Sequence, residues 1–160
     1  MDKREYKELS EQAAAGDTSA FARLYETLYR EMYYAAFYSL ADETDAVKLI
    51  ISTARDTMSA MGKLRSEEAF RAFMMKNLCA RIRTKFREYA EENRPAVSGS
   101  SPGEYDIKAE FERLDDADRL IASLYIGGKF LPDEISAYTG ISPATVKKSL
   151  DRVLSGFELD

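Results

Sequence analysis

The chain has 160 residues, with 28 acidic and 23 basic side chains, no histidine, no tryptophan and one cysteine, Cys79. Without histidine, a Ser-His-Asp or Cys-His catalytic arrangement is impossible, and a Cys/His zinc site lacks its ligands. With no histidine to activate it, Cys79 is predicted to be a core residue rather than a nucleophile. We therefore expect a protein with no catalytic residue, no metal site and no cofactor.

The same composition predicts where the protein works. One cysteine cannot form an internal disulfide, which favours a reducing cytoplasm. No apolar stretch approaches the roughly 20 residues that a membrane-spanning helix needs, so no membrane association is expected. The charged start of the chain, residues 1–5, leads into no apolar core of the signal-peptide kind.

Charge is distributed unevenly along the chain. Residues 1–45 carry a formal net charge of −5, residues 46–94 carry +5 and residues 95–160 carry −5. A basic middle therefore lies between two acidic ends, and the acidic total does not exclude a polyanionic partner.

Apolar residues at helical spacing dominate the sequence, and no run alternates apolar and polar residues as a half-buried strand would. A short first helix is expected over residues 5–15 and ends at Gly16. Asp17 or Thr18 caps a second helix. The apolar stripe of this second helix comprises Phe21, Leu24, Tyr25, Leu28, Met32, Ala35, Ala36 and Leu40.

Two further helices complete the first unit. A polar break at residues 42–45 precedes a third helix, which is predicted to stop at Gly62. Ser66 caps a fourth helix and is followed by two acidic residues, which the helix dipole favours in a first turn. The four helices are predicted to form one bundle over residues 1–90. The buried stripe expected for the fourth helix comprises Phe70, Phe73, Met74, Leu78, Ile82, Phe86 and Tyr89.

Residues 91–106 change character, with two prolines, two glycines and three serines. Such a stretch cannot sustain a helix and is predicted to be a flexible linker. The second unit, residues 107–160, contains a helix ended by Gly127 and Gly128 and then two helices separated by Gly140. The fold class predicted is all-α, with two small helical domains joined by a flexible linker.

Residues 132–152 have the pattern of a helix-turn-helix, with Gly140 in a tight turn, small Ser136 four residues before it and Val146 six after it. The second helix of this motif normally enters the DNA major groove. Cations and hydroxyls on its outer face suit phosphates and base edges. A bare helical hairpin in a bundle is the alternative. The DNA-binding residues predicted here are Ser142, Thr145, Lys147, Lys148 and Arg152.

The fourth helix is basic and could supply a second surface for DNA phosphates. For two of its cations, Arg71 and Lys85, a solvated helix face is an equal alternative. Tyrosines of the second helix (Tyr29, Tyr33, Tyr34 and Tyr38) could stack on unpaired bases, although packing accounts for most of them as well. The DNA-binding residues predicted on the fourth helix are Arg71, Lys76, Arg81, Arg83, Lys85 and Arg87.

Residues 133–152 are similar to the promoter-reading motif of the small two-domain sigma factors of bacterial RNA polymerase, the extracytoplasmic-function (ECF) group of the sigma-70 family. Residues 20–25 and 44–46 resemble the start of that family's N-terminal domain, and residues 70–73 resemble the element that ends it. The order of these segments, with a linker between them, matches the family over nearly the whole chain.

This resemblance implies a non-enzymatic subunit that directs core RNA polymerase to promoter DNA and initiates transcription. The N-terminal bundle would correspond to sigma region 2 and the C-terminal domain to region 4. An anti-sigma factor is a further expected partner. Lys48 stands where the family has an acidic residue, and Phe73 replaces a tryptophan. The residues that the resemblance assigns to polymerase binding are Asp45, Lys48, Leu49 and Ser52.

A second hypothesis remains open. The chain could be a sigma-like DNA-binding regulator that no longer engages core polymerase and acts through a protein partner. The residues that distinguish the two are those of the segment 47–55, which lacks the family's acidic pattern. An enzyme is the third class, but paired acids such as Glu67 and Glu68 point to different sides of a helix and are explained by capping.

Overall fold

The computed structural model describes residues 1–92 and 107–156, and this part of the chain is helical with no strand. The all-α prediction is confirmed. Helices α1 (Lys3–Ala14), α2 (Thr18–Leu40), α3 (Glu43–Ala60) and α4 (Glu67–Glu91) come first, with a 3-10 turn, η1 (Met61–Lys63), before α4. The predicted linker falls largely on residues 93–106, which lie outside the described residues.

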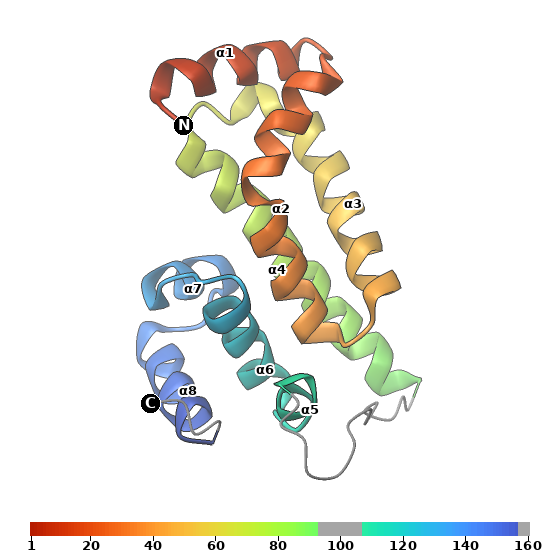
Figure 1. The fold of residues 1–160 in the computed structure, drawn as a ribbon, viewed down its shortest axis with the longest axis vertical. Helices are drawn as coiled ribbons and strands as arrows, with labels where there is room; N and C mark the ends of the chain where they lie inside the picture. Colours follow the sequence, from red (N-terminus) through yellow and green to blue (C-terminus); the bar gives the residue numbers. More distant parts are fainter. Residues whose placement is uncertain (93–106, 157–160) are drawn as a thin grey trace.

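The later helices, apart from α8, are shorter than the first four. They are α5 (Ile107–Glu112), α6 (Asp116–Ala122), a π-helical turn η2 (Ser123–Gly127), α7 (Pro132–Thr139) and α8 (Pro143–Gly156). In Figure 1, α2, α3 and α4 run side by side, and α1 crosses one end of them. The helices α5 to α8 gather beside the other half of α2 and α4, so that α7 contacts α4 and η2 contacts α2.

Local side chains set the helix starts. The carboxylates of Asp2, Asp17 and Asp42 and the hydroxyl of Ser66 each accept a hydrogen bond from a backbone N–H in the first turn that follows. Such caps satisfy donors that the helix itself leaves unpaired. Asp42 starts α3 at Glu43, inside the stretch that the sequence predicted to be a break.

One apolar cluster continues from the first four helices into the last ones. Fully buried Leu28, Met32 and Phe70 belong to the same cluster as Leu124 and Ile135. The hydroxyl of buried Tyr6 donates to the backbone oxygen of Leu64 at 2.6 Å, which fastens α1 to the turn before α4. The core is therefore shared across the boundary that the sequence placed at residues 91–106.

Cys79 belongs to this core, as predicted, with 1% of its surface exposed. Burial raises the pKa of its thiol to about 12, and the lowering effect of nearby Arg83 is smaller. At neutral pH the sulfur is therefore a protonated thiol, which is the unreactive form.

Candidate nucleic-acid interface

The turn between α7 and α8 is closed by hydrogen bonds from small side chains. Gly140 has a φ of +76°, a left-handed conformation that suits glycine. Its N–H donates to the backbone oxygen of Ser136. The Ser136 hydroxyl donates to the Ile141 oxygen at 2.6 Å. Val146 on α8 is fully buried, as is Ile135 on α7. These contacts fix the angle between the two helices.

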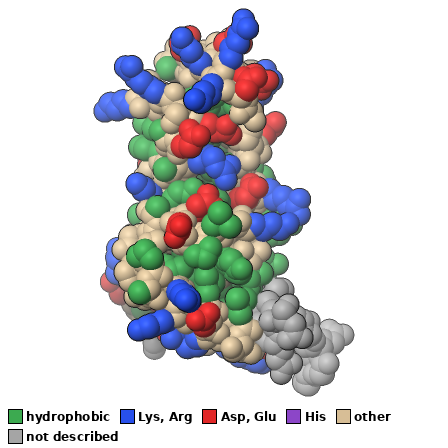
Figure 2. Space-filling view, turned by 90° about the vertical axis from the view of Figure 1, so that its left-hand side faces the viewer, with side chains coloured by type: hydrophobic (Ala, Val, Ile, Leu, Met, Phe, Trp, Pro, Cys, Tyr) green, Lys and Arg blue, Asp and Glu red, His purple; other side chains and the backbone are tan. Residues whose placement is uncertain are grey.

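The outer side of α8 carries most of the side chains that were predicted to meet DNA. Lys147 and Lys148 are exposed, as are Ser142 and Thr145. Ser142 also accepts the N–H of Thr145 at 3.2 Å and therefore begins the helix. Figure 2 views the side of the molecule that bears α7 and α8, and shows apolar side chains gathered over its lower half with Lys or Arg side chains near the lower edge.

Arg152 has a partner within the protein. Its Nε donates to one oxygen of Asp118 on α6 at 2.9 Å, and its Nη2 donates to the other at 2.7 Å. The Ser149 hydroxyl adds a third hydrogen bond at 2.6 Å. The hydrogen bonds from Arg152 hold the pKa of the Asp118 carboxyl below its usual value, against the opposing effect of burial. Arg152 was predicted from the sequence to contact DNA, and this link between α6 and α8 was not predicted.

The six cations predicted on α4 do not share one face. Three lie on one side, at spacings of seven and four residues, and line a pocket between α4 and α7: Lys76, Arg83 and Arg87. On the other sides, Arg81 is paired with Asp56 on α3, and Lys85 donates to Glu88 at 2.9 Å. Arg71 is half-buried beside Tyr138 of α7.

The residues predicted to bind polymerase lie at the start of α3. Lys48 is exposed, whereas Leu49 and Ser52 are half-buried. The Asp45 carboxylate accepts a hydrogen bond from the hydroxyl of Tyr89 near the end of α4. The four residues are therefore close together along one helix, and one of them also joins α3 to α4.

The tyrosines of α2 form two rows. One row follows α2 itself, with ring centroids 5.4 Å apart for Tyr25 and Tyr29 and 6.1 Å apart for Tyr29 and Tyr33. In the other, Tyr38 stacks on Phe111 of α5 at 4.8 Å, and Tyr34 lies next to it. Packing therefore accounts for the second row, whereas Tyr29 is 39% exposed.

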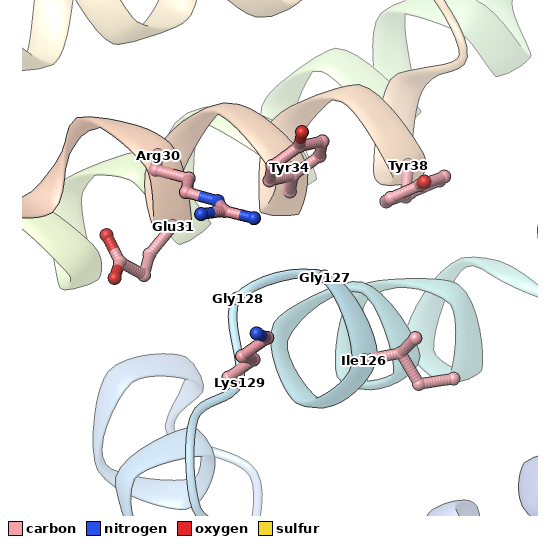
Figure 3. Close-up of a pocket in the computed structure, with 8 residues that line it drawn as sticks. All are labelled: Arg30, Glu31, Tyr34, Tyr38, Ile126, Gly127, Gly128 and Lys129. Carbon is pink, nitrogen blue, oxygen red and sulfur yellow. The ribbon is translucent and has the colours of Figure 1, made fainter.

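The second row faces the glycine turn that follows α6, across a pocket of about 300 Å³ (Figure 3). A Cβ added to Gly127 would lie 3.0 Å from the Tyr38 ring and 3.2 Å from the Tyr34 Cβ. Gly127 is therefore needed for the close approach of η2 to α2. The sequence assigned Gly127 and Gly128 only to ending a helix, although one glycine suffices for that.

Comparison with known proteins shows a likeness in fold rather than in sequence. No family model matches the chain, and no curated protein matches it. A solved structure of CnrH in complex with the cytosolic domain of CnrY is similar, with a TM-score of 0.71 and 20% identity over 96% of this chain and 95% of that chain. The chain has the fold of CnrH.

The CnrH-like fold includes both ends of the chain, because a match over 96% leaves out neither the first four helices nor the last four. Within the described residues of this fold, no group of three His, Cys, Asp or Glu side chains could hold a metal ion. None of the described helices has both the length and the apolar character needed to cross a membrane.

Proposed function

We propose that the chain is a sigma factor of the extracytoplasmic-function type, a cytoplasmic, non-enzymatic subunit that brings core RNA polymerase to promoter DNA. The observation that carries this proposal is the whole-chain likeness to CnrH, which is itself an ECF sigma factor. The sequence resemblance to the same group was found independently, from short motifs spread over the chain.

The geometry of the last two helices supports the DNA-binding part of the proposal. A recognition helix needs a rigid turn behind it and cations and hydroxyls in front of it. Here the hydrogen bonds of Ser136 and Gly140 make the turn rigid. Exposed Lys147, Lys148 and Thr145 supply the cations and a hydroxyl. We infer that α7 and α8 act as a helix-turn-helix within a C-terminal region 4.

A protein partner is the remaining part of the proposal. CnrY is an anti-sigma domain, and it is bound to CnrH in the similar structure. In this chain, Leu131 is 64% exposed just before α7. Figure 2 shows apolar side chains gathered on the face that it views. Exposed apolar patches are typical of protein interfaces. We therefore expect an anti-sigma factor as a partner.

The second candidate is a sigma-like regulator without polymerase binding. Two observations favour it: Lys48 is exposed on α3 where the family has an acid, and Asp45 is engaged with Tyr89. Both would weaken contact with a basic polymerase surface.

The deciding experiment is run-off transcription with purified core polymerase and the DNA upstream of the chain's own coding region. If the chain is a sigma factor, its addition to core polymerase yields a discrete transcript. A pull-down with core polymerase then retains the chain. Duplex binding without retention or transcript would instead support the second candidate. Absence of both duplex and polymerase binding would refute both.

A further inference from the structure

The pocket between α4 and α7 differs in charge from the other pockets. It has a volume of about 250 Å³, and the residues that line it include no carboxylate among those that the structure describes. Three other pockets each contain one glutamate: Glu31, Glu11 or Glu26. The lining of the α4–α7 pocket comprises Lys76, Arg83, Arg87, Cys79, Ala80, Thr84, Tyr138 and Thr139.

The helical repeat brings the three cations together. Positions seven and eleven residues after Lys76 return to the same side of an α-helix, so Arg83 and Arg87 lie on its side. Like charges at such a site repel one another, and this repulsion is relieved when an anion is bound.

The pocket is also rich in hydrogen-bond donors. Arg83 donates a hydrogen bond to the backbone oxygen of Thr139 at 2.9 Å. Arg87 donates one to the hydroxyl of Thr84 at 3.1 Å. A guanidinium has five N–H donors, so each arginine can still serve a ligand. Both arginines are held in place by these bonds, which lowers the entropy lost when an anion binds.

The spacing of the cations indicates the size of the anion. Lys76 and Arg87 are eleven residues apart, about 16 Å along the helix axis. A single tetrahedral phosphate is too small for both cations and Arg83 to contact it closely. The pocket volume of about 250 Å³ leaves room for two linked phosphoryl groups.

We propose that this pocket binds a free diphosphate group, either inorganic pyrophosphate or the diphosphate end of a small metabolite. The cations come from α4, and Tyr138 and Thr139 of α7 complete the lining of the pocket. The same cations belong to the α4 surface expected to meet DNA phosphates. Diphosphate and DNA would therefore compete for α4. This inference goes beyond the proposed function and does not require it.

The test is calorimetric titration of the full chain with inorganic pyrophosphate, with ionic strength held constant by sodium chloride. We expect one site, with pyrophosphate bound at least tenfold more tightly than orthophosphate. The double variant Lys76→Gln and Arg87→Gln should weaken binding at least tenfold, because two charge-assisted contacts are lost. Arg83 is left intact because its bond to Thr139 also holds α7.

The matched control is Arg55→Gln with Lys63→Gln, which removes two exposed cations elsewhere and leaves the pocket unchanged. Pyrophosphate affinity within twofold of the unaltered chain is expected for it. Equal weakening in both double variants would overturn the proposal, as would no binding at constant ionic strength. A duplex oligonucleotide that binds when pyrophosphate does not would overturn this inference while leaving the proposed function standing.

Discussion

At the scale of single residues, Asp118 illustrates how an acidic side chain holds two helices together. It is 7% exposed and receives hydrogen bonds from Ser149 and Arg152 of α8. A carboxylate that accepts several hydrogen bonds is favoured in its charged form, which is why its pKa is lowered. The ion pair of Arg152 with Asp118 is therefore a structural link between α8 and α6. Arg152 must leave Asp118 before its Nε and Nη2 can contact DNA.

Asp118→Asn is expected to lower the free energy of unfolding by about 1–3 kcal/mol at pH 7, because the negative charge and one of the two acceptor oxygens are lost. The contribution of Asp118 is present above its unfolded pKa of 3.8 and is lost as pH falls toward its lower folded pKa. Urea unfolding of both proteins should therefore show the difference shrinking as the pH falls from about 5 through the lowered folded-state pKa of Asp118. A difference that stays constant over this range would contradict the ionic role of Asp118.

At the scale of elements, α8 offers a direct test of DNA contact. Replacing Lys147 and Lys148 with alanine should weaken duplex binding and reduce the slope of log affinity against log salt by about 2, because each phosphate contact releases counterions. Binding is measured by fluorescence anisotropy over a salt series.

Lys3→Ala with Lys7→Ala on α1 is the matched control, since it removes the same charge from exposed positions at the far end of the molecule. A slope that the α8 pair leaves unchanged would show that α8 does not contact the duplex backbone. A slope reduced equally by both pairs would assign the effect to net charge.

The elements also show what a sequence can predict. The cap at Ser66 was predicted correctly, and Asp17 is one of the two caps predicted for α2, because a cap depends on residues within one turn of it. The buried stripe predicted for α2 was largely correct, because the helical repeat alone decides which residues share a face. The pocket that Lys76, Arg83 and Arg87 line was not predicted, since its other wall is α7, whose position the local sequence does not reveal. Arg152 was given a DNA role because its distant partner, Asp118, cannot be seen from spacing.

At the scale of the whole molecule, the last helices are fastened to the first four by several different contacts. Tyr38 stacks on Phe111, and the Arg119 guanidinium lies 5.0 Å from the centre of the Phe86 ring. Gly127 also approaches α2 closely, since a Cβ added to it would lie 3.0 Å from the Tyr38 ring. A change at this glycine should therefore separate the contribution of packing between the two halves from the stability of each half.

Gly127→Val is expected to destabilise the chain by about 1–3 kcal/mol, because the added side chain meets Tyr34 and Tyr38. For a chain of this size, such a loss lowers the melting temperature by roughly 3–10 °C. Gly62→Val is the control, since a Cβ at Gly62 would meet nothing within 4 Å. Thermal unfolding followed by circular dichroism compares them, and equal melting temperatures would contradict the close packing of η2 on α2.

The stacking of Tyr38 on Phe111 makes the molecule suited to optical measurement. The chain has ten tyrosines and no tryptophan, so its native fluorescence comes from tyrosine alone. A single tryptophan at position 111 would accept excitation energy from Tyr38, its neighbour at 4.8 Å, and would emit at a wavelength where tyrosine does not. Any movement of α5 away from α2 would then shift that emission to the red as water reached the indole. One substitution would thus give a real-time signal for the separation of the two halves, with no external dye.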